Sequence, residues 1–364
     1  MSHLIKLSVK FIGLCTILFY LSYQFISCTA LDSQQIDAYI QSYKDFSGAV
    51  LVAQGDKTIL KKGYGCAHYE FNIPNDNATR FPIASNTKIF TAIAIMLLQE
   101  KQMLGVHDPV DKYIPGFPKT ITLHHLLTHT SGLPNYYKHW NAICACKDLH
   151  EIINAVKSWE LEFTPGSQYC YSNTGYLVLA HIVATVSGLT FEQFLSVHIF
   201  EPLKMYDTGS ISTGRIVLHK ASGYIAKDAL LYTAPAIMNP ITLLGNGDLY
   251  SSISDMHIFM QALFSGTIIS KNSLAITLLP HVKMESSSDR AHGYGWFIDT
   301  QHGKRIVDYS GALVGFLSKV VHFIDENITI VILTNREAMA EFSTLCDGLV
   351  ATCFLRKVGH KSPI

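Results

Sequence analysis

The spacing with the clearest chemical potential is Ser85-Asn86-Thr87-Lys88, which stands at the head of the apolar segment Ile89–Leu98. If this stretch begins a buried helix, residues three apart lie on one face, about 5–6 Å between Cβ atoms. A lysine in apolar surroundings loses affinity for its proton, and a neutral amine can activate a serine hydroxyl as a nucleophile. The pattern therefore predicts nucleophilic catalysis by Ser85. Ser-x-x-Lys also arises by chance, however, and a serine before an apolar run is most often only an N-cap.

Length and composition exclude several classes of protein. The chain has 364 residues, of which 48% are hydrophobic, so we expect a large core and more than one structural unit. The 28 basic and 28 acidic residues cancel. This balance provides no basic field for nucleic acid and no acidic tail. We therefore expect no nucleic-acid partner.

The first 30 residues are predicted to be a targeting segment. A basic start precedes the apolar run Phe11–Leu21, which has the length of a signal-peptide core and is too short to span a bilayer comfortably. Cys28-Thr29-Ala30 suits cleavage, and Phe25–Cys28 also resembles a bacterial lipoprotein box with Phe where Leu is usual. Cleavage, lipidation at Cys28 and an uncleaved signal anchor are the alternatives. All three place the body outside the cytoplasm, either secreted or periplasmic, and the last two attach it to a membrane.

Cysteine and histidine spacings do not predict a metal site or a cofactor. Cys144-Ala145-Cys146 lacks a second pair at zinc spacing. His125 and His129 are four apart, but Leu126 stands where the metalloprotease pattern requires Glu. Six cysteines lie beyond the targeting segment and allow 15 pairings; we expect mainly buried small hydrophobes with one or two disulfides. These six are Cys66, Cys144, Cys146, Cys170, Cys346 and Cys353.

The alternation of apolar runs and turns predicts strands at both ends of the chain and helices between them. A hairpin is expected over 46–65, with Gly55 in its turn. A four-stranded meander is expected over 293–299, 305–310, 317–323 and 328–333, followed by a covering helix over 342–354. The predicted fold is α/β (α+β), with one antiparallel sheet flanked by helices. We expect a sheet domain from 31–100 and 286–364, an inserted helical domain over 101–285, and the site in the cleft between them.

Three short motifs follow one another along the chain: Ser85-x-x-Lys88, Tyr171-x-Asn173 and Tyr309-Ser310-Gly311. This order resembles the class C β-lactamase and D-Ala-D-Ala carboxypeptidase family of serine hydrolases. The flanks are similar too, including Leu126–Leu133 and the Gly-Phe pair after the third motif. The resemblance runs from about Phe46 to Asn335, and each motif is weak alone while the ordered set is specific.

The resemblance implies a role for each catalytic motif residue. Ser85 would attack an acyl carbon and form an acyl-enzyme, while Lys88 and Tyr171 would share the base and acid work. A tyrosine with a pKa near 10 serves as a base only if positive charge lowers that pKa, and Lys88 is the candidate neighbour. Asn173 would bond Lys88 and a substrate amide. The alternative for Tyr171 is a tyrosine that only packs at the start of a helix, and the alternative for Asn173 is an N-cap of the following helix.

The third motif would bind substrate through Tyr309, Ser310, Gly311 and Ala312. The N–H groups of Ser85 and Ala312 would form an oxyanion hole. Gly311 would let substrate lie against the strand edge, and an ordinary bulge is its alternative.

Tyr309 departs from the family pattern, which has Lys, or His in esterase-like members, at this position. Tyrosine lacks the positive charge that would pair with a substrate carboxylate. The resemblance, with this departure, therefore implies an ester or amide hydrolase acting on a small-molecule or peptide substrate that need not carry a carboxylate there. The alternatives are a β-lactamase or D-Ala-D-Ala carboxypeptidase proper, and a catalytically weak protein that binds cell-wall peptides. An α/β-hydrolase is excluded because no Gly-x-Ser-x-Gly elbow is present.

Overall fold

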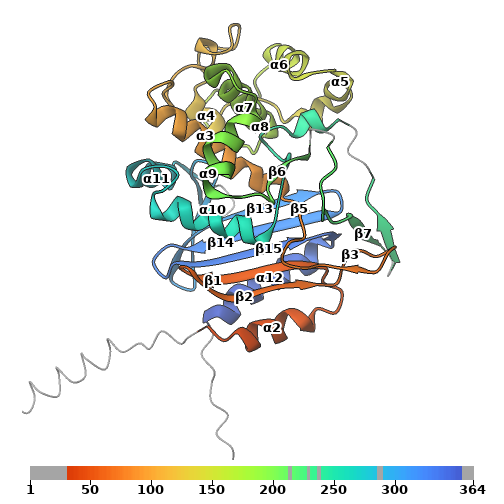
Figure 1. Ribbon diagram of the computed structural model, residues 1–364. Helices are drawn as coiled ribbons and strands as arrows, with labels where there is room; N and C mark the ends of the chain where they lie inside the picture. The colour runs from red at the N-terminus through yellow and green to blue at the C-terminus, as the bar shows by residue number, and fades with distance from the viewer. Residues whose placement is uncertain (1–30, 212–214, 228–229, 236–238, 285–289, 355–364) are drawn as a thin grey trace, which may run out of the picture.

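The computed structural model describes residues 31–211, 215–227, 230–235, 239–284 and 290–354 (Figure 1). The predicted targeting segment 1–30, with Cys15 and Cys28, lies outside the described residues.

Within the described residues, eight strands form one antiparallel sheet in the order β10-β11-β12-β13-β14-β15-β1-β2. β1 pairs with β15 from Gly48↔Thr334 to Gln54↔Ile328, which joins the two ends of the chain. The strands are β1 (Gly48–Gln54), β2 (Lys57–Tyr64), β10 (Val282–Lys283), β11 (Ala291–His292), β12 (Phe297–Gln301), β13 (Lys304–Leu313), β14 (Phe316–Phe323) and β15 (Ile328–Thr334). The predicted fold class, with its N-terminal hairpin joined to a C-terminal meander, is thus confirmed.

The central strands are apolar on both faces because helices cover both sides of the sheet (Figure 1). Successive side chains of β1 alternate between two cores, as a two-residue strand period requires. Ala49, Leu51 and Ala53 face the larger core on the side of the middle helices. Val50 and Val52 face a smaller core against α2 (Ser33–Ser42) and α12 (Met339–Phe354). The expected covering helix is therefore present.

One strand boundary differs from the sequence prediction. The first meander strand was expected to begin at residue 293 but begins at Phe297. The preceding residues turn instead, with Gly293 N–H donating to the Trp296 carbonyl at 2.8 Å. Gly295 has φ +74°, and a Cβ there would lie 2.9 Å from the Lys88 carbonyl. The turn is therefore packed directly against the helix that carries Lys88.

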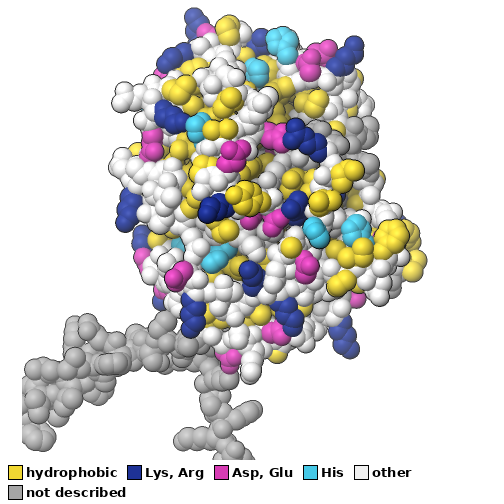
Figure 2. Space-filling model, in the orientation of Figure 1, with side chains coloured by type: hydrophobic (Ala, Val, Ile, Leu, Met, Phe, Trp, Pro, Cys, Tyr) yellow, Lys and Arg dark blue, Asp and Glu magenta, His cyan; other side chains and the backbone are white. Residues whose placement is uncertain are grey.

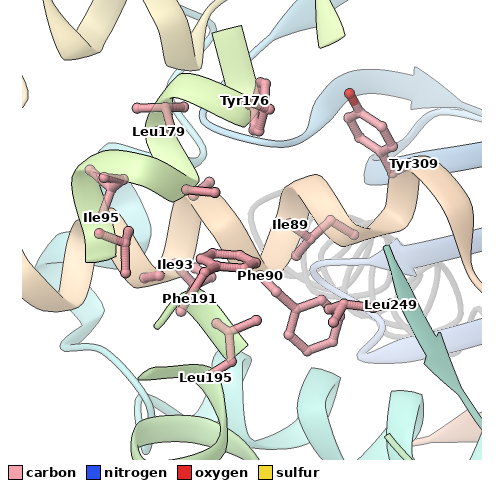
Figure 3. Close-up of a cluster of buried hydrophobic side chains, with 14 of the residues drawn as sticks. Ile89, Phe90, Ile93, Ile95, Tyr176, Leu179, Phe191, Leu195, Leu249 and Tyr309 are labelled. Atoms are coloured by element: carbon pink, nitrogen blue, oxygen red, sulfur yellow. The ribbon is translucent and has the colours of Figure 1, made fainter. Parts of the chain in front are cut away.

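The helix α3 (Thr87–Glu100), preceded by the 3-10 turn η1 (Ala84–Asn86), is buried along nearly its whole length. Figure 3 shows its apolar side chains Phe90 and Ile93 among residues of the helices around it. The Phe90 ring lies 4.2 Å from that of Phe259, centroid to centroid. The middle helices are α4 (Leu123–Leu127), α5 (Trp140–Ala145), α6 (Leu149–Lys157), α7 (Asn173–Ser187), α8 (Phe191–Leu195), α9 (Glu201–Leu203), α10 (Ile253–Ser265) and α11 (Lys271–Thr277).

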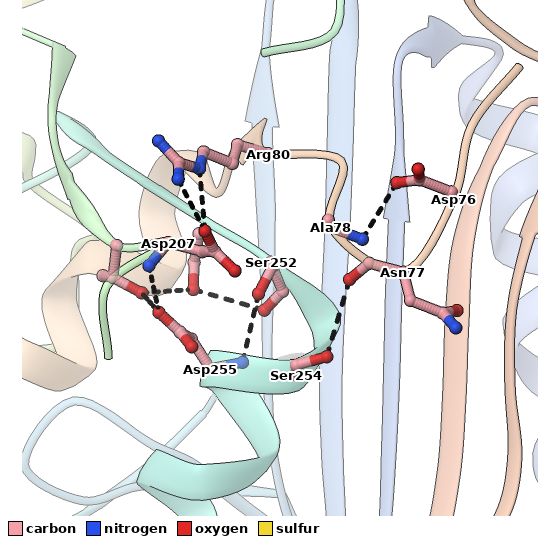
Figure 4. A network of polar contacts seen from close by, with 10 residues as sticks. Asp76, Asn77, Ala78, Arg80, Asp207, Ser252, Ser254 and Asp255 are labelled. Carbon is pink, nitrogen blue, oxygen red and sulfur yellow. Dashed lines mark hydrogen bonds and ion pairs between the residues drawn. The ribbon is translucent and has the colours of Figure 1, made fainter. Parts of the chain in front are cut away.

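A polar network fixes the strand that leads into the Ser85 turn (Figure 4). Arg80 donates to the Asp207 carboxylate at 2.6 and 3.0 Å. The backbone N–H of Asp207 then donates to the Asp255 carboxylate, and the N–H of Asp255 donates to Ser252 Oγ at the start of α10.

The remaining strands are short. They are β3 (Cys66–His68), β4 (Ile73–Pro74), β5 (Phe81–Pro82), β6 (Gly209–Ser210), β7 (Tyr224–Lys227), β8 (Leu230–Thr233), β9 (Leu249–Ser251) and β16 (Arg336–Glu337).

Some larger features of the fold bear on earlier expectations. α10, from the middle of the chain, contacts β1 and β15, so the division into 31–100 with 286–364 and 101–285 stays a proposal.

In the described part of the chain, all six cysteines are free, and only Cys346 and Cys353 are buried. No single described helix has the length and apolarity to cross a membrane; the α7 segment with Phe191–Leu203 meets the criterion only as a pair bent by 74°. Figure 2 shows basic and acidic side chains interspersed on the visible face.

Candidate active site

The structure brings the first two motifs together around the Ser85 hydroxyl. Ser85 lies in η1, and its Oγ is 3.2 Å from Lys88 Nζ one turn later. Tyr171 lies just before α7, 86 residues further along the chain, and its hydroxyl oxygen is 2.9 Å from Ser85 Oγ. The two helix starts therefore meet, and one hydroxyl contacts an amine and a phenol at once.

The turn that carries Ser85 has a strained backbone. Ala84 has φ +47°, in the left-handed region that residues with a Cβ rarely occupy. Such a conformation costs about 1–3 kcal/mol and persists only where the surroundings enforce it. Here Ile83 N–H donates to the Leu249 carbonyl at 2.9 Å, and the Ile83 carbonyl accepts from Ser318 Oγ at 2.7 Å. Strands β9 and β14 thus hold the turn from both sides.

Lys88 is fully buried and its environment favours the neutral amine. Its Nζ donates to Asn173 Oδ1 and to the Asn246 carbonyl, both at 2.8 Å. No carboxylate among the described residues forms an ion pair with it, and burial lowers its pKa well below the ordinary value. A neutral amine has two N–H donors, which these two oxygens use. Its lone pair is then left to accept the Ser85 proton.

Asn246 is a site residue that the sequence analysis missed. Its loop, Leu243–Asp248, looks like an ordinary glycine-rich turn in the sequence. The buried carboxylate of Asp248 accepts from Gly245 N–H at 2.9 Å and from Ser210 Oγ at 2.7 Å. The Asn246 side chain donates to the Thr242 carbonyl at 2.8 Å. These bonds aim the Asn246 carbonyl at Lys88; the glycines in the loop were the only signal in the sequence.

The environment of Tyr171 differs from the one expected. Burial raises its pKa to about 12, which outweighs the hydrogen bond from Ser85. The sequence analysis expected Lys88 to lower this pKa, but Lys88 Nζ lies over the ring face, 4.9 Å from its centroid. Because burial also keeps the amine neutral, it supplies no full positive charge. Tyr171 therefore keeps its proton and is placed to donate it.

Tyr309 lies behind the site, beneath its surface. Its ring is fully buried and stacks on Phe297 at 4.9 Å, with 19° between the ring planes. Figure 3 shows it standing off β13 on the same side as α3 and Tyr176. Burial raises its pKa well above the ordinary value, so it is neutral. Neither its charge nor its position matches a cation that pairs with a substrate carboxylate.

Gly311 has a packing role that the sequence analysis did not anticipate. A Cβ there would lie 2.3 Å from the Ile83 carbonyl oxygen and 2.9 Å from Ser85 N. The glycine thus lets β13 pack against the Ser85 turn, and its register with Ser318 is regular, without a bulge. Ser85 N–H, in the first turn of η1, belongs to the group of donors that a helix leaves unpaired. The contact places this N–H beside the segment that contains Ala312.

A pocket of about 420 Å³ opens over these groups. β12 pairs with β13 only as far as Asp308, so no described strand pairs with this edge of Tyr309–Leu313. Six of the eight predicted site residues line the pocket: Ser85, Tyr171, Asn173, Ser310, Gly311 and Ala312. Lys88 and Tyr309 lie behind it. Sequence reasoning missed the rest of the lining, which includes Tyr137, Lys319 and α12. No local pattern marks those residues.

The two histidines that were considered as metal ligands have separate structural roles. His125 caps α4 through Thr122, and its Nδ1 accepts from the Thr122 N–H at 3.2 Å. His129 has φ +58°, and its Nδ1 accepts from Ser172 N–H at 3.2 Å, directly behind Tyr171. Burial lowers the pKa of His129 well below the ordinary value. In the described part of the chain, no group of three or more His, Cys, Asp or Glu side chains could hold a metal ion.

Comparisons with known proteins identify the family of the chain. The family model described as "Beta-lactamase" matches residues 34–351. Penicillin-binding protein 4* of Bacillus subtilis (strain 168) is 33% identical over 317 residues, which cover 82% of this chain and 70% of that protein. The crystal structure of a penicillin binding protein from Bacillus halodurans is 28% identical, with a TM-score of 0.76, and covers 85% of this chain and 98% of its own.

A more distant structure shares the fold. The D-amino acid amidase of Ochrobactrum anthropi SV3, complexed with L-phenylalanine, has a TM-score of 0.77 and 23% identity, over 88% of this chain and 97% of its own. The family match covers nearly the whole described chain and includes the Ser85, Tyr171 and Tyr309 segments. The chain therefore belongs to the β-lactamase family of serine hydrolases.

Proposed function

We propose that the protein hydrolyses an ester or amide through an acyl-enzyme on Ser85. One observation carries this proposal. Ser85 Oγ lies 3.2 Å from a fully buried Lys88 amine and 2.9 Å from the Tyr171 hydroxyl. A nucleophile within hydrogen-bond reach of a base, itself oriented by Asn173 and Asn246, is the arrangement that activates a serine.

In the proposed acylation step, neutral Lys88 takes the Ser85 proton as Oγ attacks the acyl carbon. The resulting oxyanion accepts hydrogen bonds from the N–H groups of Ser85 and Ala312. As the tetrahedral intermediate collapses, Tyr171 donates its proton to the leaving oxygen or nitrogen, and Lys88 returns a proton to Tyr171. The acyl group stays on Ser85.

Water then attacks the acyl-enzyme and the proton transfers run in reverse. Tyr171 accepts a proton from the water as it passes its own proton to Lys88, and Lys88 then protonates Ser85 Oγ as the serine leaves. Burial raises the pKa of Tyr171 to about 12 and lowers the pKa of Lys88 well below its ordinary value, which favours Lys88 as the first base and Tyr171 as the proton donor.

The substrate class follows from the charges near the pocket. Tyr309 is buried and neutral, so the third motif offers no cation to a carboxylate. We therefore favour esters and amides over penicillins and carboxy-terminal peptides. The amidase that shares the fold supports an amide as one substrate, while the penicillin-binding-protein names of relatives support the β-lactamase and D-Ala-D-Ala carboxypeptidase alternatives. A non-catalytic peptide-binding protein is disfavoured by the close contacts at Ser85.

The cellular setting is part of the proposal. The basic start and apolar run at residues 1–30 support export, with attachment through the N-terminal segment or Cys28 as alternatives. The proposed acyl transfer uses side chains alone and requires no metal or cofactor.

Labelling with a fluorophosphonate probe tests the nucleophile. The wild type and Ser310→Ala, which alters another serine of the same pocket, should be labelled, and Ser85→Ala should not. Persistent labelling of Ser85→Ala would refute the assignment. A panel of p-nitrophenyl esters, D-amino-acid amides and cephalosporins then ranks substrates. Efficient cephalosporin cleavage without ester cleavage would contradict the proposed preference.

A further inference from the structure

The pocket over Ser85 continues past the Tyr309–Leu313 edge of β13 into a groove against α12. Ser310 and Ala312 point to the sheet face opposite Gly311, because neighbouring residues of a strand alternate between faces. Lys319 lies across from Ser310 on β14, and Asp347 lies on α12. All four line the same pocket as Ser85. We call this extension, lined by Ser310, Leu317, Lys319, Met339, Phe342 and Asp347, the α12 groove.

The charges around the α12 groove leave one carboxylate uncompensated. The Lys319 ammonium is paired with Asp308, which is fully buried. Arg290 also contacts Asp308, at 2.9 and 3.0 Å, and Asp299 at 3.3 Å. Two cations and two carboxylates therefore cancel.

Asp347 is the remaining charge. Asp347 is exposed and forms no ion pair with any described residue. Among the described residues that line the pocket, the charged side chains are Lys319 and Asp347. The groove therefore has a net charge of −1, and a positively charged group on a bound molecule would be attracted to it.

The apolar part of the groove suits the stem that would carry such a group. Leu317 is buried, Phe342 is partly buried, and Met339 is 58% exposed at the rim. An alkyl or aromatic stem can cover this surface while its charged end stays in water, as the long stems of lysine and arginine do. Tyr309, the position at which the family pattern places a cation, adds no competing charge.

We infer that the substrate is an ester or amide that carries an ammonium group, and that Asp347 of the α12 groove selects for this group. The inference rests on the proposed function because it names the substrate class of the same pocket. An exposed ion pair of this kind changes kcat/KM by about two- to fivefold.

The first experiment measures charge preference without catalysis. Isothermal titration of Ser85→Ala with hexylammonium, hexanol and hexanoate compares three probes of similar length. Hexylammonium should bind about two- to fivefold more tightly than hexanol, and hexanoate more weakly. Equal binding of all three, or tighter binding of hexanoate to Lys319, would overturn the inference whether or not Ser85 is a nucleophile.

The second experiment uses turnover. p-Nitrophenyl esters of 6-aminohexanoate and hexanoate place the charge on the acyl part; phenylacetyl thioesters of cysteamine and ethanethiol place it on the leaving group. The ammonium member should be preferred in at least one pair, and Asp347→Asn should remove that preference. Asp347→Lys should reverse it. Glu341→Gln, on the same helix but outside the groove, should leave it unchanged. A preference that Asp347→Asn does not alter would assign the selection to other residues and refute the role of Asp347.

Discussion

Replacing Gly311 with alanine should disable the site although it changes none of the proposed catalytic side chains. The added Cβ would lie 2.3 Å from the Ile83 carbonyl oxygen, whereas ordinary contact begins at 3.4 Å, so β13 and the Ser85 turn must separate by about 1.1 Å. Ser85 N lies 2.9 Å from the same Cβ position and would be displaced with the turn. The proposed oxyanion hole lies between these two segments.

The expected loss can be set from two general magnitudes. A misplacement of about 1 Å in an active site costs roughly 10² in rate, and one oxyanion donor is worth about 10²–10³ in kcat. We therefore expect kcat/KM of Gly311→Ala to fall by at least about 10², or about 2.7 kcal/mol of transition-state stabilisation. Overpacking should also lower the free energy of unfolding by about 1–3 kcal/mol.

Gly247→Ala is the matched control, because Gly247 also lies close to the turn that carries Ser85. Its Cβ would come no closer than 3.6 Å to Leu243 and 3.8 Å to Ala84, which is ordinary contact. Both variants should show a cooperative thermal transition before their hydrolysis of a p-nitrophenyl ester and their labelling rates are compared. If Gly311→Ala kept wild-type kcat/KM, or if both variants lost activity equally, the steric reasoning would be wrong.

Three further predictions concern protons. Lys88 acts as a base only when neutral, so kcat/KM should fall on the acid side as Lys88 is protonated and should show no alkaline decline until pH approaches about 12, the pKa of Tyr171; an alkaline limb near pH 8 would contradict this. Asn173→Asp would place a carboxylate 2.8 Å from Lys88 Nζ and raise its pKa, so the acid limb should move up by about 1–3 pH units; an unmoved limb in the pH–rate profile would exclude Lys88 as the titrating base. Burial raises the pKa of Asp248 from 3.8 to about 6, so the folded protein binds this proton more tightly than the unfolded chain and loses stability as pH rises between those values, by about 3 kcal/mol. Asp248→Asn should therefore raise the free energy of unfolding at pH 7.5 by about 1–3 kcal/mol in urea titrations; a lower value would show that the carboxylate is worth more to its loop than its burial costs.

Features that depend on neighbouring residues could be predicted from the sequence. The hairpin that became β1 and β2 follows from an apolar run, a turn at Gly55 and a second strand-like run, and a glycine adopts the φ of +57° at Gly55 without strain. The closeness of Ser85 and Lys88 follows from helical spacing, which needs no information about the rest of the chain. The order of the three motifs also indicated the family before any of their side chains was placed.

Features that depend on burial or on distant segments could not be predicted from the sequence. Whether Lys88 is neutral, and whether the pKa of Tyr171 rises or falls, depends on how much water surrounds them, and that is set by packing between α3, α7 and the Asn246 loop. Tyr309 looked like a substrate-binding residue until its burial against Phe297 placed it behind the pocket.

The packing role of Gly311 likewise appeared only with tertiary structure, because the nearest backbone atoms that a side chain there would meet belong to Ile83 and Ser85, more than 220 residues earlier in the sequence. A sequence states which groups are available. The local periods of helix and strand decide which of them are close along the chain. Desolvation and contact between remote segments decide their protonation and their access to substrate, and both are properties of the folded core.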